Sequence, residues 1–142
     1  HKEIWNIKCD VALPCATQNE IDLESAKTLV SNGTICVGEG ANMPCTLEAT
    51  NYFVENKIMF GPAKAANAGG VMVSGLEMSQ NSMRYSWTLE EVESKLKSQM
   101  ENIFEEVYKC AKDYGNEYDT VLGANISGFK KVSQAMLAQG VC

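Results

Sequence analysis

The chain has 142 residues, of which 45% are hydrophobic, and its 12 Lys and Arg against 18 Asp and Glu give a formal net charge of -6 and a pI near 4.8. This length and apolar content suffice for one domain, or part of a larger one, with a packed core. The acidic balance and the lack of a basic cluster exclude nucleic acid as an expected partner, because nucleic-acid binders gather Lys and Arg on one face. No apolar run approaches the ~20 residues of a membrane span, and the first residues do not resemble a secretory signal, so we expect no membrane association. The chain also starts without Met, which suggests a fragment or a processed product.

Short apolar runs alternate with helical patterns in the first half of the chain. Strands are expected at residues 10–14, 34–37 and 58–60, and helices at residues 22–31 and from residue 46 onward. Pro14 ends the first strand because proline cannot donate to a sheet ladder, and Asn32-Gly33 stops the first helix. Alternation of strands and helices predicts an α/β fold with a parallel sheet and right-handed crossovers.

Residues 64–75, with the sequence KAANAGGVMVSG, form a run of small residues with a few polar groups at fixed offsets. On an α-helix, Asn67, Val71 and Ser74 share one face, where an amide, a methyl-lined wall and a hydroxyl converge. The two adjacent glycines each cost helix stability by ~1 kcal/mol relative to alanine. A backbone that lies against a ligand or against another helix would explain them, and both explanations remain open.

Polar segments rich in Gly and Ala follow each of the predicted strands. They are residues 15–19, 38–42 and 64–74. Ligands bind beyond the carboxyl ends of the strands in parallel sheets, so we expect these segments to form a ligand site. Backbone groups at Gly40 and Ala41, beside the amide of Asn42, suit a neutral polar ligand such as a ribose or a carboxamide. A phosphate cradle is not expected, because the chain has neither GxGxxG nor GxxxxGK[ST].

Long helical patterns take over from residue 88. Residues 88–91 have the sequence of a capping box, in which a Thr hydroxyl and a Glu carboxylate satisfy first-turn amides. The helix that follows should run to about residue 114, with an apolar stripe in the core. That stripe consists of Val92, Leu96, Met100, Ile103 and Val107. A last helix is expected over residues 119–139, broken or loosely packed near Gly123 and Gly128.

The chain has six cysteines, but their spacing disfavours a metal site. No CxxC pair is present and the only histidine is His1, so neither a zinc site nor a Cys-His nucleophilic pair is expected. Because the apolar content makes disulfides unnecessary, we expect reduced and mostly buried cysteines in an intracellular protein. The cysteines are Cys9, Cys15, Cys36, Cys45, Cys110 and Cys142.

Four motifs, in order and at plausible spacing, resemble the carboxyl-terminal part of glutamate dehydrogenase, of the small hexameric microbial type. The motifs are LPCATQNE at residues 13–20, EGANMP at residues 39–44, KAANAGGV with a following Ser at residues 64–74, and GANI through AMLAQG at residues 123–140. The resemblance implies that residues 1–87 are the carboxyl-terminal part of a Rossmann-like nucleotide-binding domain with a hinge and a substrate-facing helix. It implies that residues 88–142 are a helical segment that packs back on that domain. One departure is Cys45, where the family commonly has threonine; we expect it to alter only packing.

What the resemblance implies is reversible oxidative deamination of L-glutamate to 2-oxoglutarate and ammonium, with hydride passing to NADP or, alternatively, to NAD. Ser74 would hydrogen-bond the side-chain carboxylate of glutamate, Val71 would pack on its methylenes, and Gly70 would belong to the same substrate site. The residues implied at the nicotinamide-ribose end are Ala16, Thr17, Gly40, Ala41, Asn42 and Asn67. A cytoplasmic homohexamer is implied as well. The catalytic lysine and aspartate and the Gly-rich dinucleotide turn of this family precede the matched region, so no catalytic residue and no metal ligand is expected in this chain.

Two other functions remain open. A non-catalytic interaction or regulatory module could share the scaffold, but it would not need the identities of Asn67, Val71 and Ser74. A leucine or phenylalanine dehydrogenase would share the fold, but an apolar substrate side chain gains nothing from a hydroxyl at Ser74.

Overall fold

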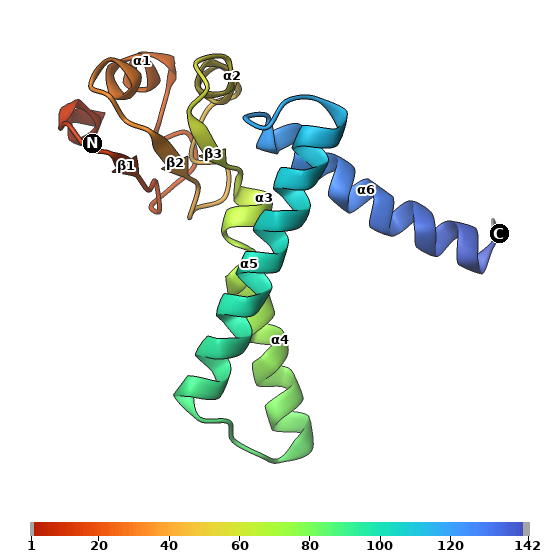
Figure 1. The fold of residues 1–142 in the computed structure, drawn as a ribbon. Coiled ribbons are helices and arrows are strands. Elements are labelled where there is room, and N and C mark those ends of the chain that lie inside the picture. Colours follow the sequence, from red (N-terminus) through yellow and green to blue (C-terminus); the bar gives the residue numbers. More distant parts are fainter. Residues whose placement is uncertain (1, 141–142) are drawn as a thin grey trace.

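The structure is a computed structural model, and it describes residues 2–140 of the chain. Its centre is a parallel sheet of three strands in the order β1-β2-β3, namely β1 (Val11–Ala12), β2 (Cys36–Gly38) and β3 (Met59–Gly61). A short 3-10 helix, η1 (Lys2–Asn6), precedes β1. Helices α1 (Leu23–Ser31) and α2 (Leu47–Glu55) connect successive strands and lie side by side over one face of the sheet (Figure 1). The expected α/β fold with a parallel sheet is thereby confirmed.

Local caps explain why both crossover helices begin where the sequence predicts. The carboxylate of Asp22 accepts a hydrogen bond from the Ser25 amide at 2.9 Å, and the hydroxyl of Thr46 accepts one from the Ala49 amide at 3.3 Å. Each bond satisfies one of the amides that the first helical turn leaves without a partner. Gly33 then stops α1 with a φ of 88°, which a residue without a β-carbon adopts easily.

The two faces of the sheet differ in burial. Ala12, Val37 and Phe60 are aligned across the three strands and are at most 3% exposed, because they face α1 and α2. The core that they share with the two helices includes Ile21, Leu29, Ala49 and Phe53. On the other face, Val11 is exposed, and Cys36 and Met59 are half-buried. The alternation places the core on one side of the sheet only.

The run of small residues after β3 forms two helices, α3 (Ala63–Ala66) and α4 (Ala68–Met83). The prediction of one continuous helix is wrong at Asn67, whose φ of -98° and ψ of 3° interrupt the helix. The interruption has a physical reason, because the Asn67 side chain bonds to the loop after β2 instead of following the helix surface.

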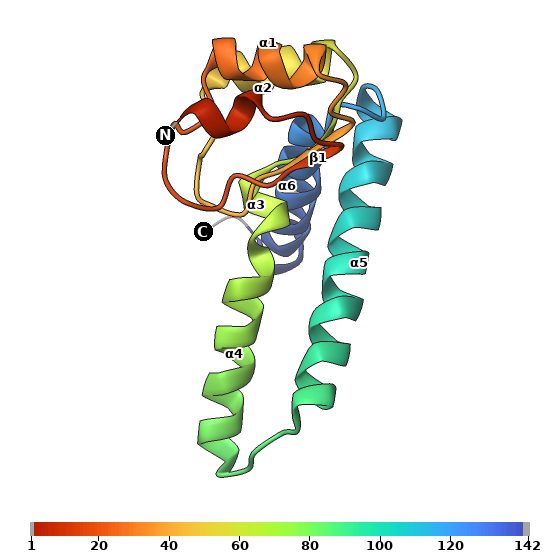
Figure 2. The same cartoon turned by 90° about the vertical axis from the view of Figure 1, so that its left-hand side faces the viewer.

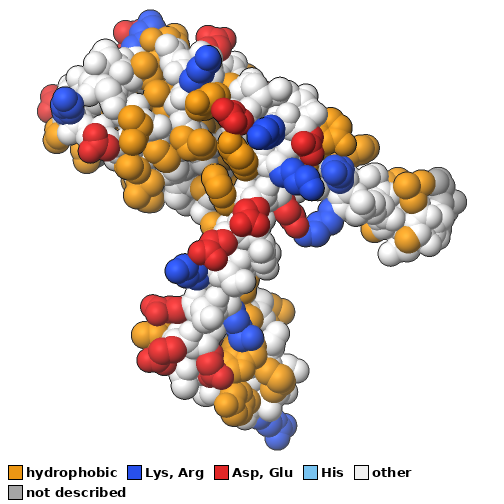
Figure 3. Space-filling model, in the orientation of Figure 1, with side chains coloured by type: hydrophobic (Ala, Val, Ile, Leu, Met, Phe, Trp, Pro, Cys, Tyr) orange, Lys and Arg blue, Asp and Glu red, His pale blue; other side chains and the backbone are white. Residues whose placement is uncertain are grey.

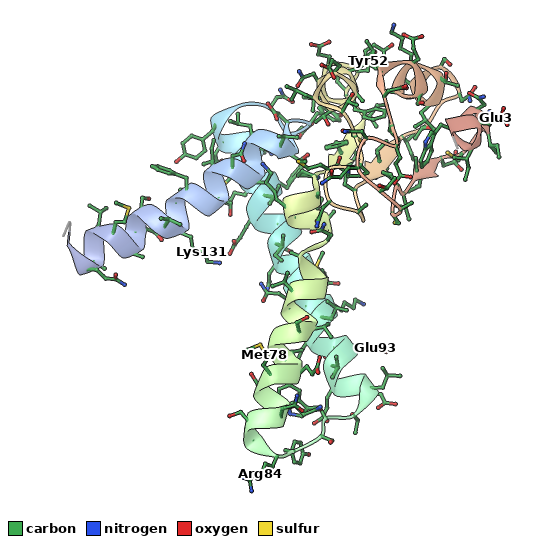
Figure 4. The ribbon with its side chains drawn as sticks, turned by 180° about the vertical axis from the view of Figure 1, so that it is seen from behind. Glu3, Tyr52, Met78, Arg84, Glu93 and Lys131 are labelled. Atoms are coloured by element: carbon green, nitrogen blue, oxygen red, sulfur yellow. The ribbon has the colours of Figure 1, made fainter. Side chains whose placement is uncertain are left out.

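Helices α4 and α5 (Leu89–Tyr114) lie side by side and form an arm that projects from the sheet (Figures 1 and 2), with Arg84 at its tip (Figure 4). The capping box at the start of α5 is confirmed: the Thr88 hydroxyl accepts from the Glu91 amide, and the Glu91 carboxylate accepts from the Thr88 amide at 2.7 Å. The apolar stripe of α5 is less buried than predicted. Val107 is buried, whereas the other four members are half-buried, because one neighbouring helix covers only part of their surface.

Helix α6 (Thr120–Gln139) is continuous, so of the two alternatives predicted near Gly123 and Gly128 the break is wrong, whereas loose packing holds at Gly128, where a β-carbon would meet nothing within 4 Å. Gly123 instead permits α6 to cross very close to α5, since a β-carbon there would lie 2.3 Å from the carbonyl oxygen of Val107. The Thr120 hydroxyl donates to the carbonyl of Phe60, which fixes the start of α6 against β3. The far half of α6 extends away from the body, and Figure 3 shows exposed apolar side chains there, on the arm and on the sheet body.

The five described cysteines are all free, but they are less buried than expected. Cys45 and Cys110 are buried, Cys9 and Cys36 are half-buried, and Cys15 is exposed because it lies in the loop after β1. Cys142 and His1 lie outside the described residues.

Candidate functional site

A cleft of about 620 Å³ lies beyond the carboxyl ends of the strands, between the loops that follow β1 and β2 and the start of α4. All nine residues that the sequence analysis assigns to substrate or cofactor line this cleft. The lining consists of Cys15, Ala16, Thr17, Gln18, Gly40, Ala41, Asn42, Asn67, Gly70, Val71 and Ser74. Cys15 and Gln18 are additions within a segment that was predicted to face the site. The structure brings the predicted residues together, and their individual roles stay predictions.

The loop after β1 is held by a carboxylate at its far end. One oxygen of Glu20 accepts hydrogen bonds from the amides of Ala16 at 3.0 Å and Thr17 at 3.4 Å. The carbonyl of Glu20 in turn accepts a bond from the indole of Trp5 at 3.0 Å. These contacts use the backbone amides of Ala16 and Thr17, so the Thr17 hydroxyl and the Gln18 carboxamide are the side-chain donors that the loop can offer to a ligand.

The loop after β2 is held by the end of β1. The amides of Gly40 and Ala41 both donate to the carbonyl of Pro14, at 3.1 and 3.0 Å. The expectation that backbone groups of Gly40 and Ala41 serve the ligand is therefore wrong for their N–H groups. The Cys15 side chain favours glycine at position 40, since a β-carbon there would lie 2.4 Å from the sulfur of Cys15 in its present rotamer.

Asparagine side chains connect the two walls of the cleft. The Asn67 amide donates to the side-chain oxygen of Asn42 at 2.6 Å and reaches the carbonyl of Ala41 at 3.4 Å. The Asn42 amide nitrogen has no acceptor among the described residues, which leaves a donor in the cleft lining for a ligand. Sequence reasoning identified both residues, but it did not predict that they bond to each other.

The start of α4 supplies the other wall, and its adjacent glycines have different neighbours. A β-carbon at Gly69 would lie 2.9 Å from Leu96 on α5, so Gly69 serves helix packing. A β-carbon at Gly70 would meet nothing within 4 Å, so Gly70 keeps the cleft open. The helix-packing explanation therefore holds for Gly69, and the ligand explanation stays a prediction for Gly70.

Val71 and Ser74 lie on the same wall, about one turn apart. Val71 is 78% exposed and belongs to the cleft lining, so it offers an apolar surface to a ligand there. The Ser74 hydroxyl donates to the carbonyl of Gly70 at 3.1 Å, which is a common bond for serine in a helix. A carboxylate in the cleft could replace that carbonyl as the acceptor.

A second carboxylate lies beneath the cleft, and sequence reasoning missed it. Glu39 is 6% exposed, and its two oxygens accept from the amide of Cys45 at 3.2 Å and from the amide of Ala63 at 2.8 Å. The signal that could have identified it is its place in the EGANMP motif, directly after a buried strand.

The thiols of Cys45, which is buried, and Cys36, which is half-buried, lie outside the cleft lining and have raised pKa values. Burial raises the pKa of the Cys45 thiol, and the negative charge of Glu39 and a hydrogen bond to it raise that pKa further. Burial also raises the pKa of Cys36. A thiol must lose its proton to attack a substrate, so these shifts keep both cysteines unreactive. The burial of Cys45 agrees with the packing role expected for it.

No charged side chain belongs to the cleft lining, so the site is neutral. Carboxamide and hydroxyl groups fit such a lining, whereas a pyrophosphate would lack a cationic partner. The residues present therefore fit the nicotinamide-ribose end of a dinucleotide. Over residues 2–140, no group of three His, Cys, Asp or Glu side chains could hold a metal ion, and no helix is long and apolar enough to cross a membrane.

Comparisons of sequence and of structure with known proteins lead to the same family of dehydrogenases. The family model for Glutamate/Leucine/Phenylalanine/Valine dehydrogenase matches residues 1–140. The NAD-specific glutamate dehydrogenase of Porphyromonas gingivalis is 56% identical over 99% of the chain, and the NADP-specific glutamate dehydrogenase of Helicobacter pylori is 52% identical over 97%. The crystal structure of Plasmodium falciparum glutamate dehydrogenase superimposes with a TM-score of 0.93 and 53% identity over 97% of the chain.

The chain is shorter than these relatives. It covers 32% of the first, 31% of the second and 30% of the Plasmodium chain. The match nevertheless extends through the sheet, the cleft loops, the arm and α6. The chain therefore belongs to the Glutamate/Leucine/Phenylalanine/Valine dehydrogenase family.

Proposed function

We propose that this chain is the carboxyl-terminal part of a glutamate dehydrogenase, which converts L-glutamate reversibly to 2-oxoglutarate and ammonium with NADP or NAD. The observation that carries the proposal is the neutral cleft in which Val71 and Ser74 on α4 face the loop that carries Asn42. Identities of 51 to 56% with proteins named glutamate dehydrogenase support the choice of this reaction within the family.

The α4 wall binds the substrate in this proposal. Ser74 donates a hydrogen bond to the side-chain carboxylate of glutamate, Val71 packs on the methylenes, and Gly70 leaves room for the substrate beside the helix. The Ser74 hydroxyl favours glutamate over leucine or phenylalanine as the substrate, because an apolar substrate side chain would offer this hydroxyl no acceptor.

The opposite wall, together with Asn67 at the start of α4, binds the nicotinamide end of the cofactor, which accepts or returns a hydride when it is bound. The residues proposed for this end are Ala16, Thr17, Gly40, Ala41, Asn42 and Asn67. Amide groups of Asn42 and Asn67 suit the carboxamide and the ribose, and their mutual hydrogen bond holds them in place for the ligand. The catalytic lysine and aspartate belong to a part of the polypeptide other than these residues.

NADP is the cofactor that we propose, with NAD as the alternative, on the resemblance to the microbial enzymes. The chain is 56% identical to a relative named NAD-specific and 52% identical to a relative named NADP-specific. These relatives support a nicotinamide dinucleotide as the cofactor. We also propose a division at about residue 87 between a nucleotide-binding part and a helical part, a homohexamer, and a cytoplasmic location. The free thiols of all five described cysteines support a reducing compartment.

The test uses the natural polypeptide that contains this chain, purified from its source. Its intact mass should be several times 15.5 kDa, and it should reduce NADP or NAD with glutamate far faster than with leucine or phenylalanine. An equal or faster rate with leucine would transfer the proposal to another reaction of the family. A mass near 15.5 kDa, with no reduction of either cofactor, would favour a non-catalytic module.

A further inference from the structure

Glu39 is a buried carboxylate for which the proposed function has no use. It follows β2 directly, its own amide donates to the carbonyl of Gly61 on β3 at 2.9 Å, and its side chain is not part of the cleft lining. A charged group with 6% exposure loses hydration on folding, so it persists only where hydrogen bonds replace the lost water.

The two oxygens of Glu39 bond to different walls of the cleft. Oε1 accepts from the amide of Cys45, at the far end of the loop that carries Asn42. Oε2 accepts from the amide of Ala63, the first residue of α3. The residue before α3 is Pro62, which offers no side-chain cap, so Glu39 satisfies an amide that the short helix itself leaves unpaired.

The two hydrogen bonds that Glu39 accepts link the segments that carry Asn42 and Asn67. Residues 39–45 form a loop that the Cys45 contact closes, with Asn42 at its middle. Asn67 stands directly after α3, whose first residue is held by the same carboxylate. Glu39 therefore bonds to both segments that carry the Asn42–Asn67 pair, whose own bond is 2.6 Å long.

We propose that Glu39 is a positioning residue for the nicotinamide end of the cofactor. It does not touch the ligand; it holds Asn42 and Asn67 at the spacing that the ligand meets. This assignment rests on the proposed function. Glutamate suits the position because both carboxylate oxygens are acceptors, whereas glutamine would direct an NH₂ group at one of the two amides. Aspartate is one methylene shorter, so we expect it to keep one of the two bonds and lose the other.

The experiment compares Glu39→Gln and Glu39→Asp with wild type in the natural polypeptide. Fluorescence titration with NADPH and NADH gives the cofactor Kd without turnover, and hydrogen exchange reports the amides of Cys45 and Ala63. Glu39→Gln should weaken cofactor binding by about tenfold or more, as expected from a displaced binding group. The two amides should exchange faster, while the KM for glutamate at saturating cofactor stays within about threefold because the contacts of Ser74 are untouched. Glu39→Asp should fall between wild type and Glu39→Gln.

Asp119→Ala is the matched control. The Asp119 carboxylate also accepts one backbone amide bond, from Leu122 at 2.9 Å, but it caps α6 and does not line the cleft. This variant should lower the melting temperature and leave the cofactor Kd unchanged. If Glu39→Gln behaves in the same way, Glu39 is a structural residue only and the proposal is wrong.

Two further outcomes separate this proposal from the proposed function. If wild type binds the cofactor but does not oxidise glutamate, the substrate assignment fails, and Glu39 is judged by the cofactor Kd alone. If wild type binds neither NADPH nor NADH, both proposals are wrong.

Discussion

Replacing Ser74 by alanine removes one hydroxyl from the α4 wall of the cleft and leaves the helix intact. The hydroxyl donates to the carbonyl of Gly70, but that carbonyl lies in a helix, where the amide of residue 74 is its regular partner. The substitution therefore leaves no buried polar group unpaired, and alanine is the best helix former. Stability should stay the same or rise slightly, so a change in kinetics reports binding.

The expected loss follows from two hydrogen bonds. A bond from a hydroxyl to a carboxylate contributes ~1.5–3 kcal/mol, and exchanging the existing bond to the Gly70 carbonyl costs ~0.5 kcal/mol of that gain. The difference of ~1–2.5 kcal/mol corresponds to a rise of about 5- to 70-fold in the KM for glutamate. The KM for the cofactor should change little, because Ser74 belongs to the wall opposite Asn42.

Steady-state kinetics on the natural polypeptide measures both KM values, and Ser79→Ala provides the control. The Ser79 hydroxyl donates to the carbonyl of Gly75 at 2.9 Å, one turn further along α4 and outside the cleft lining. Ser79 thus makes the same hydrogen bond to the carbonyl four residues earlier as Ser74, but it lies outside the cleft. Equal rises in both KM values for Ser74→Ala, or the same effect from Ser79→Ala, would refute the assignment of Ser74 to the substrate.

Three further predictions concern stability, which urea unfolding measures. Gly123→Ala should destabilise the chain by more than ~1 kcal/mol, because the new β-carbon would overlap the α5 backbone. Gly128→Ala has open space around it and should stabilise the chain by up to ~1 kcal/mol. Equal effects of the two substitutions would contradict the close crossing of α5 and α6. Thr120→Val should cost ~1 kcal/mol or more through the lost bond to the carbonyl of Phe60, and Thr120→Ser should retain most of that stability. The pKa of the Cys45 thiol is raised above its ordinary value of 9.0 in the folded chain. Above pH 9.0 the thiol therefore ionises in the unfolded chain and stays protonated in the folded chain. The free energy of unfolding should fall as the pH rises past 9.0. Cys45→Thr should reduce that fall, and an unchanged pH profile would count against the shift.

Features fixed by neighbours in sequence could be predicted well. Thr46 and Thr88 begin their helices as expected, because the cap and the amide that it binds are three residues apart. The parallel sheet and the position of the cleft followed from the alternation of strands and helices, since the carboxyl ends of such strands share one edge. All nine predicted site residues come from the segments at that edge.

Features fixed by distant residues could not be predicted in the same way. The hydrogen bond from Ala63 to Glu39 spans 24 positions, and the hydrogen bond from Asn67 to Asn42 spans 25. No local sequence pattern predicts either bond. The sequence predicts a break or loose packing near Gly123 because the cost of glycine to a helix is visible in sequence, whereas the close crossing with α5 that requires Gly123 is not. The burial of the α5 stripe was overestimated for a similar reason, because amphipathicity does not say how much of the stripe a neighbour covers.

The contact between Gly40 and Cys15 has a consequence for how related sequences can diverge. A β-carbon at position 40 would overlap the Cys15 sulfur at 2.4 Å, yet it would lie 3.5 Å from the Cys15 β-carbon, an ordinary contact distance. Alanine at position 40 is therefore compatible with alanine at position 15, but with cysteine only if the exposed Cys15 sulfur moves to another rotamer. The two positions should co-vary between homologues, with the volume gained in one loop matched by the volume lost in the other.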